Sequence, residues 1–222
     1  MSDHIRTLVQ LGVGDLDLVG GKGANLGELA TAGVPVPNAF CVTTHAYRSF
    51  LAGAGLGERI DRVLEGIDYD DPAGIETDAA WIRSLMMETS TPPDIETAIV
   101  ASYQDLEARL GSGLSVSVRS SATAEDLPGM SFAGQQDTYL FISGTDAVVD
   151  AVKRCWASLW TDRAIAYRHT QGFAHCDVHL AVVVQEMFPS EVSGVLFTAN
   201  PITSNPGTLK QKVPENIFST GP

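Results

Sequence analysis

The chain has 222 residues, of which 44% are hydrophobic, and its 27 acidic and 14 basic side chains give a formal net charge of -13. This acidic excess argues against general nucleic-acid binding, which needs a basic face. No apolar run reaches the ~20 residues of a transmembrane helix, and the start lacks a signal-peptide layout, so we expect a cytoplasmic protein without a membrane partner.

The first hundred residues are expected to fold mainly as helices. A short strand is expected at residues 5–11, and a buried strand at residues 40–44 leads into a helix. Three amphipathic stripes between residues 53 and 113 predict helices that pack on one another, and Pro92-Pro93 separates the second stripe from the third. The stripes contain Ile60, Val63, Leu64 and Ile67; Ala80, Trp81, Leu85 and Met86; and Ile95, Ala98, Ile99 and Tyr103.

Residues 18–29 (LVGGKGANLGEL) form the first segment with suggestive chemistry. Two glycines precede Lys22, and a short helical pattern follows until Gly33. A lysine at a glycine-flanked helix start places an ammonium beside free backbone N–H groups, and both favour an anion. The segment is not a Walker A loop, because Gly23 stands where Ser or Thr should follow the lysine. A plain glycine turn with an exposed lysine is the alternative.

Residues 115–139 (SVSVRSSATAEDLPGMSFAGQQDTY) form the second such segment. Alternation over residues 115–118 predicts a half-buried strand that ends at Arg119, followed by a loop rich in small and hydroxyl residues. This composition is typical of a phosphate cradle, because the guanidinium offers a planar fork of donors and small residues let backbone N–H groups approach an anion. An ordinary surface loop, whose glycines only permit turns, explains the composition equally well.

The last third of the chain alternates strands and helices. A strand is expected at residues 138–142, and Thr145 is expected to cap an amphipathic helix. The apolar run of residues 178–187 predicts a central strand covered on both faces, and residues 193–198 predict a second one. Elements in this order predict an α+β fold with a mostly antiparallel sheet.

The cysteines and histidines give no sign of a metal or nucleophile site. Cys41, Cys155 and Cys176 are irregularly spaced and form no CxxC pair, which fits small buried residues in a reducing compartment. The five histidines form no HExxH motif and no triad-like pattern, so no metal ligand is predicted.

Five motifs in one order resemble a known family: LVGGKGANLGEL, VRSSATAEDLPGMSFAGQQDTY, CWASLWTDRAIAYR, LAVVVQEM and SGVLFTANPITSN. They are similar to the nucleotide-binding N-terminal domain shared by phosphoenolpyruvate synthase, pyruvate phosphate dikinase and rifamycin (rifampicin) phosphotransferase. The resemblance covers residues 18–205 and favours the phosphate-cradle interpretation. The sequences of the motifs CWASLWTDRA and FTANPITSN resemble rifamycin phosphotransferases more than they resemble the synthases.

The resemblance implies an ATP-grasp-like α+β architecture, in which this chain supplies the N-terminal lobe and the second lobe is incomplete. It assigns Lys22 and Arg119 to the ATP phosphates as the catalytic cations. It places three residues in the loop and strand that cover the phosphates: Gly134, Gln135 and Thr138. It places three more in the segment against the adenine: Gln185, Glu186 and Met187.

The resemblance also implies what other parts of such an enzyme supply. Residues 1–205 correspond to the ATP-binding domain, whereas residues 206–222 depart from the family pattern and are expected to be a truncated or foreign tail. Ligands for Mg²⁺ are expected beyond residue 222, and the phosphohistidine that passes a phosphoryl group onward is absent here.

The function implied for the parent protein is an ATP-dependent phosphotransferase of the dikinase type. It splits ATP into AMP and phosphate and passes a phosphoryl group to the hydroxyl of a rifamycin bound by other domains. Pyruvate, as in phosphoenolpyruvate synthase, is the alternative acceptor. A non-catalytic nucleotide-binding module is the alternative of another class, and the chain on its own is expected to be inactive.

Overall fold

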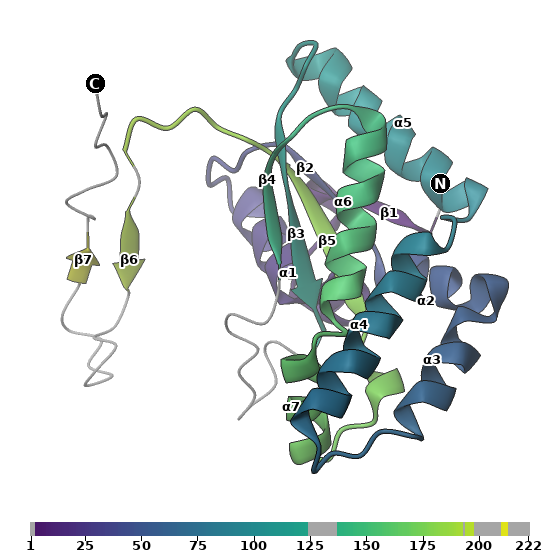
Figure 1. Ribbon diagram of the computed structural model, residues 1–222. Helices are drawn as coiled ribbons and strands as arrows, with labels where there is room; N and C mark the ends of the chain where they lie inside the picture. Colours follow the sequence, from purple (N-terminus) through teal and green to yellow (C-terminus); the bar gives the residue numbers. More distant parts are fainter. Residues whose placement is uncertain (1–2, 124–136, 193, 198–209, 213–222) are drawn as a thin grey trace, which may run out of the picture. The chain divides into compact units, whose positions relative to one another are not determined.

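The computed structural model describes residues 3–123, 137–192, 194–197 and 210–212 (Figure 1). The chain divides into two compact units, Met1–Met187 and Phe188–Pro222. The first unit contains all the helices of the described residues, and the second contains a pair of short strands. Among the described residues, no helix combines the length and the apolar character needed to cross a membrane.

The first unit is built on a five-stranded sheet with the order β1-β2-β5-β3-β4, in which every neighbouring pair is antiparallel. The strands are β1 (Ile5–Thr7), β2 (Ala39–Val42), β3 (Val116–Ala122), β4 (Thr138–Ile142) and β5 (Leu180–Glu186). The α+β class and the mostly antiparallel sheet predicted from the sequence are therefore confirmed. The apolar run that contains β5 forms the central strand, as predicted, since β2 and β3 pair with its two edges. Helices cover both of its faces, which explains why the run is almost continuously apolar.

Two apolar layers sandwich this sheet. Helix α1 (Leu16–Thr31) packs on β3 and β5 from one side, and α6 (Thr145–Ser158) packs on the same strands from the other (Figure 1). The layer beneath α1 is small and includes Val19, Ala24, Cys41 and Val183. The layer beneath α6 is the main core, where Phe50 stacks on Trp156 with ring centroids 5.1 Å apart.

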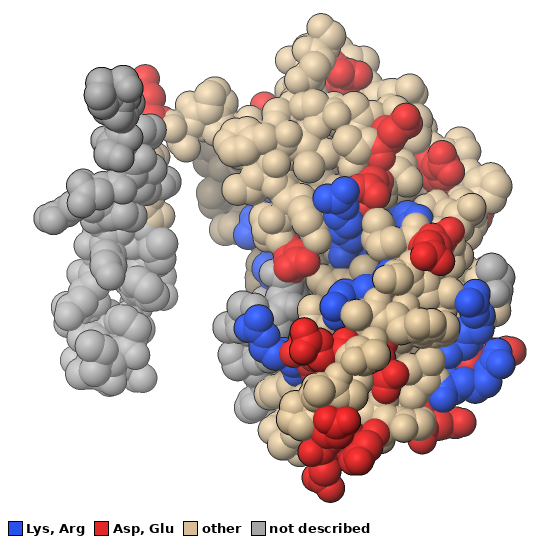
Figure 2. All heavy atoms as spheres, in the orientation of Figure 1, with Lys and Arg blue, Asp and Glu red and all other residues tan. Residues whose placement is uncertain are grey.

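The remaining helices surround the main core, and each of the three predicted stripes falls on a helix. These helices are α2 (Thr44–Ala52), α3 (Leu56–Leu64), α4 (Pro72–Glu88), α5 (Pro93–Leu110) and α7 (Asp162–Thr170). The second stripe is partly wrong as a packing face, because Ala80 and Trp81 are exposed, and Ile67 of the first stripe lies beyond the end of its helix. Short 3-10 turns join them: η1 (Leu8–Gln10), η2 (Val13–Asp15), η3 (Gly53–Gly55) and η4 (His175–Asp177). Acidic and basic side chains are intermingled on the face drawn in Figure 2, as on an ordinary solvated surface.

Three sequence-based boundaries are corrected by the structure. Strand β3 continues past Arg119 to Ala122, because β5 pairs with it along its whole length. Gly144, and not Thr145, is the N-cap of α6. The first strand ends at Thr7, where the chain turns into η1.

The second unit contains β6 (Val195–Phe197) and β7 (Lys210–Lys212), which pair antiparallel with Val195 opposite Lys212. The prediction that residues 193–198 form a second central strand is wrong, because β6 pairs with β7 in a separate two-stranded sheet. A three-residue apolar strand does not reveal its partner through its own sequence.

Candidate functional site

The site begins with a break inside α1. Gly20 has φ 66° and ψ 174°, so the helix stops there and starts again at the next residue. Lys22 therefore lies in the first turn of a new helical segment, as the glycine-flanked pattern predicts. A Cβ on Gly20 would stand 2.3 Å from the carbonyl oxygen of Ser121 on β3, so only glycine allows this approach.

Two further glycines bring the same segment close to the rest of the unit. A Cβ on Gly23 would lie 3.2 Å from the Sγ atom of Cys41 on β2. A Cβ on Gly27 would lie 2.5 Å from the backbone oxygen of Leu11. The glycines of this motif therefore let α1 pack closely on its neighbours, in addition to allowing the break in the helix at Gly20.

Ser121 joins the two sides of the break. Its hydroxyl donates to the carbonyl oxygen of Val19 at 2.7 Å and accepts from the backbone N–H of Gly23 at 3.2 Å. The side chain is fully buried, so water does not replace either partner. Ser121 lies within the predicted cradle segment, residues 115–139, but its sequence neighbours do not indicate this role.

Arg119 lies on the same side of the sheet as α1. Its partner across the strands is Val183, which belongs to the apolar layer beneath α1, and directly opposite residues share a face. Arg119 also stands opposite Thr138 on the edge strand β4. Arg119 and Thr138 therefore lie on the side of the sheet that is covered by α1, the helix of Lys22. Ser121, two positions after Arg119 on β3, connects this strand to the turn that carries Lys22.

The residues predicted to lie against the adenine are at the carboxyl end of β5. The backbone N–H of Glu186 donates to Asn38 O at 2.8 Å, and that of Met187 donates to Ser115 O at 2.9 Å. The Glu186 carboxylate accepts from the side-chain amide of Asn38 at 2.8 Å. These two N–H groups are thus occupied by the chain itself, and adenine recognition by Gln185, Glu186 and Met187 stays a prediction.

The residues predicted for the phosphate end and for the base end of the nucleotide site lie along the same two strands, β3 and β5. Ser121 stands opposite Ala181, whereas Ser117 stands opposite Gln185. Four residues of strand separate these pairs, which corresponds to about 13 Å at 3.3 Å per residue. Gly134 and Gln135 lie outside the described residues.

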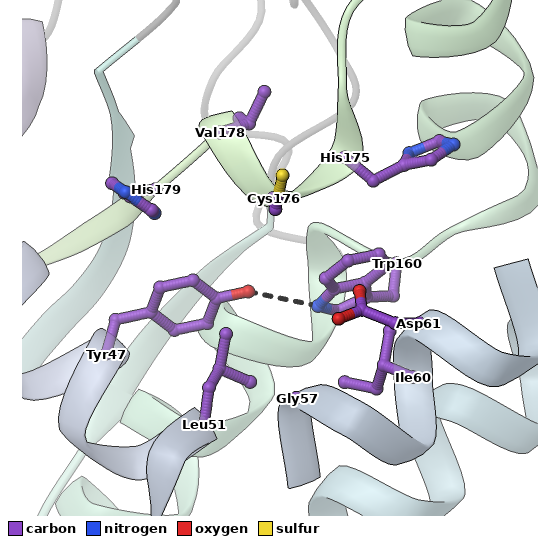
Figure 3. Close-up of a pocket in the computed structure, with 10 residues that line it drawn as sticks. All are labelled: Tyr47, Leu51, Gly57, Ile60, Asp61, Trp160, His175, Cys176, Val178 and His179. Carbon is purple, nitrogen blue, oxygen red and sulfur yellow. Dashed lines mark hydrogen bonds between the residues drawn. The ribbon is translucent and has the colours of Figure 1, made fainter.

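The hollows found among the described residues lie away from the predicted nucleotide-binding residues, as two of them illustrate. The first, of about 100 Å³, has Tyr47 and Trp160 on its walls, and the Trp160 ring N–H donates to the Tyr47 hydroxyl at 3.1 Å (Figure 3). The second, of about 290 Å³, combines charged and imidazole side chains near the end of β3. It is lined by Asp17, Leu18, His45, Arg48, Thr123, Asp177 and His179. Neither hollow is lined by Lys22 or Arg119, and neither was predicted, because its residues are scattered along the chain.

A buried arginine stabilises the region beside the first hollow. The Nε atom of Arg168 donates to Nδ1 of His175 at 2.9 Å, and another guanidinium nitrogen donates to Leu159 O at 2.7 Å. Nε2 of His175 lies 3.0 Å from the Tyr69 hydroxyl. Burial, followed by the charge of Arg168, lowers the pKa of His175 to about 4. Burial also lowers the pKa of Arg168 to about 10.

This arrangement predicts that acid destabilises the first unit. The pKa of His175 is lower in the folded chain than the usual 6.5, so its contribution to stability is complete above pH 6.5 and is lost as the pH falls toward 4. Because His175 is only half buried, solvent screening reduces the expected loss to about 1–2 kcal/mol. Urea unfolding at pH 7 and pH 4.5 should show this loss for the wild type and a smaller one for His175→Gln. Equal losses in both chains would contradict the assignment.

Within the described ranges, no group of three or more His, Cys, Asp or Glu side chains could hold a metal ion. Contact of a nucleotide with Lys22, Arg119 and Thr138 stays a prediction.

Comparison with known proteins places this sequence in a family. Residues 16–213 match the pyruvate phosphate dikinase AMP/ATP-binding domain. The phosphoenolpyruvate synthase of Pyrococcus furiosus is 44% identical over 90% of this chain and 29% of its own length. A probable phosphoenolpyruvate synthase of Methanocaldococcus jannaschii is 49% identical over 90% of this chain and 17% of its own length.

A third relative carries a different name. The rifampicin phosphotransferase of a Streptomyces species is 49% identical over 84% of this chain and 21% of its own length. The chain thus spans less than a third of the length of these curated relatives. The resemblance seen in the five sequence motifs is confirmed, and the chain belongs to the family of the pyruvate phosphate dikinase AMP/ATP-binding domain.

Proposed function

We propose that this chain binds ATP as part of a dikinase-type phosphotransferase with an ATP-grasp-like site, in the cytoplasm. The observation that carries the proposal is that Lys22 and Arg119 belong to elements on one side of the sheet, a helix start and a strand that Ser121 joins to it. Lys22 and Arg119 are each partly exposed, and they come from two elements, α1 and β3, that pack on each other.

The chemistry asked of these residues is binding and charge neutralisation. Phosphoryl transfer depends mainly on positioning and on electrostatic stabilisation of the phosphate oxygens. In this proposal the Lys22 ammonium and the Arg119 fork hold the phosphates, while Thr138, Gly134 and Gln135 cover them. Mg²⁺, bound by residues outside this chain, would neutralise further phosphate charge. The base would lie toward residues 185–187, about 13 Å or more along the strands from Ser121.

The parent reaction proposed is the conversion of ATP into AMP and phosphate, with one phosphoryl group passed through a histidine to an acceptor. The sequence of residues 155–164 and 197–205, which resembles rifamycin phosphotransferases, favours a rifamycin hydroxyl as the acceptor. The names of the relatives from Pyrococcus and Methanocaldococcus favour pyruvate as the second candidate. A parent protein assayed with both acceptors, each with labelled ATP, separates the two.

Calorimetric titration of the chain with ATP tests the binding proposal directly. We expect saturable ATP binding that is much stronger than adenosine binding, because the phosphates provide the charged contacts. We expect no AMP from the chain alone, because none of its five histidines lies in a motif like that of the family's phosphohistidine. AMP release by the chain would contradict that second expectation, and the absence of ATP binding at millimolar ATP would overturn the proposed function.

A further inference from the structure

We propose that Ser121 is a positioning residue, which orients Lys22 toward ATP by capping, from the neighbouring strand, the helical segment that carries it. The inference rests on the proposed ATP-binding function and adds to it the residue that fixes one of its two cations.

The segment that begins after Gly20 has the unsatisfied N–H groups of any helix start. An N-cap side chain normally comes from the residue just before the helix and accepts from the second or third N–H group. Here that preceding residue is Gly20, which has no side chain to offer. The Ser121 hydroxyl takes over the role, because it accepts from Gly23, the third residue of the segment, at 3.2 Å.

The same hydroxyl also binds the other side of the break. It donates to Val19 O at 2.7 Å, so a single oxygen atom is bonded to the last residue before Gly20 and to the first turn after it. Lys22 lies between these two contacts in the sequence, and the backbone of this turn sets the direction of its side chain.

Ser121 is itself held firmly. It lies in β3 opposite Ala181 of β5 and is fully buried, so its hydroxyl has a fixed position relative to the sheet. Arg119 is on the same strand and the same face, two residues earlier. The hydroxyl therefore sets the position of the Lys22 turn relative to Arg119, and the two cations are presented to the phosphates as a pair.

Removal of this hydroxyl should affect the phosphate end of the ligand and leave the base end unchanged. In calorimetric titrations of the full chain, we expect Ser121→Ala to bind ATP about tenfold more weakly, if the stability lost with a helix cap appears as lost order of the Lys22 turn. Adenosine, which has no phosphates, should bind both chains equally. A residue with only a structural role would weaken both ligands to a similar extent.

A double-mutant cycle with Lys22 sharpens the test. If Ser121 acts through Lys22, then Ser121→Ala should cause no further loss of ATP affinity in a Lys22→Ala background. Ser158 provides a matched control, since it is also buried and donates to a backbone carbonyl, that of Cys155 at 2.7 Å. Ser158→Ala should bind ATP as the wild type does.

Ser121→Thr keeps the hydroxyl but adds a methyl group to a fully buried site, so it should keep the wild-type ratio of ATP affinity to adenosine affinity even if packing lowers both. It also covers the case in which Ser121→Ala does not fold. Three results would each overturn the inference: unchanged ATP binding by a folded Ser121→Ala chain, equal losses with and without Lys22, or a loss by Ser121→Thr of ATP binding but not of adenosine binding. Failure of the proposed function looks different, because the wild type itself would then show no ATP binding and Lys22→Ala would change nothing.

Discussion

Replacement of Lys22 by alanine should weaken ATP binding by about 100-fold, which corresponds to the loss of a charged hydrogen bond of up to about 3 kcal/mol. The expected effect is large because Lys22 stands at a helix start, where its ammonium and the backbone N–H groups attract the same anion. Calorimetry with ATP, AMP and adenosine should show that the loss grows with the number of phosphates.

Replacement of Arg119 should also weaken ATP binding, and here the planar shape of the guanidinium should matter as well as its charge. Arg119→Ala should cost about as much affinity as Lys22→Ala, and Arg119→Lys should recover only part of it, because an ammonium lacks the planar fork. Arg62→Ala removes the same charge from α3, where Arg62 binds Glu58 O at 3.2 Å, and controls for net charge. If Arg62→Ala weakened ATP binding as much as Lys22→Ala and Arg119→Ala, the losses would be explained by the net charge of the chain and not by specific phosphate contacts.

Gly20→Ala should destabilise the first unit by about 3 kcal/mol or more in urea unfolding, since two penalties combine. The backbone at φ 66° and ψ 174° lies in a region that is essentially restricted to glycine. The added Cβ would also meet three atoms of Ser121 at 2.3, 2.5 and 2.6 Å, two of which are backbone atoms in a central strand. Neither the strand nor the helix start can move away without loss of its hydrogen bonds.

Gly33→Ala separates these two penalties. Gly33 also has a positive φ, of 77°, but a Cβ there would have no atom within 4 Å. We therefore expect a loss of only about 1 kcal/mol, from backbone strain alone. Similar losses for Gly20→Ala and Gly33→Ala would show that the contact with β3 is unimportant, and that backbone conformation alone explains the first glycine.

The helices and the central strand could be predicted because their patterns are long and local. The three apolar stripes repeat over several turns, and the apolar run at β5 is too continuous for a surface strand. Boundaries were less accurate, as the extension of β3 from Arg119 to Ala122 shows. Hydroxyl residues suggested a loop there, but pairing with β5 outweighed their local preference.

The candidate site was partly predictable. Lys22 and Arg119 were singled out because few cations stand beside glycine and small residues, and the structure places the elements that carry them on one side of the sheet. The Ser121 bridge could not be predicted, since the two hydrogen-bond partners lie 98 and 102 positions away in the chain. The β6–β7 pair was missed for the same reason, because strand pairing is not local. The family match continues to residue 213, into the segment predicted as an atypical tail, and the origin of that tail stays a prediction.

The strand order has a consequence for the way the chain acquires its structure during synthesis. Strand β5 is the last of the five to be made, yet it lies between β2 and β3. Until residue 186 has left the ribosome, β2 and β3 each have an open edge and no hydrogen-bonded route to each other. The sheet is therefore completed by a late insertion, a non-local step of the kind that slows folding and exposes unpaired strands to aggregation. Chaperone demand should be greatest just before that strand emerges.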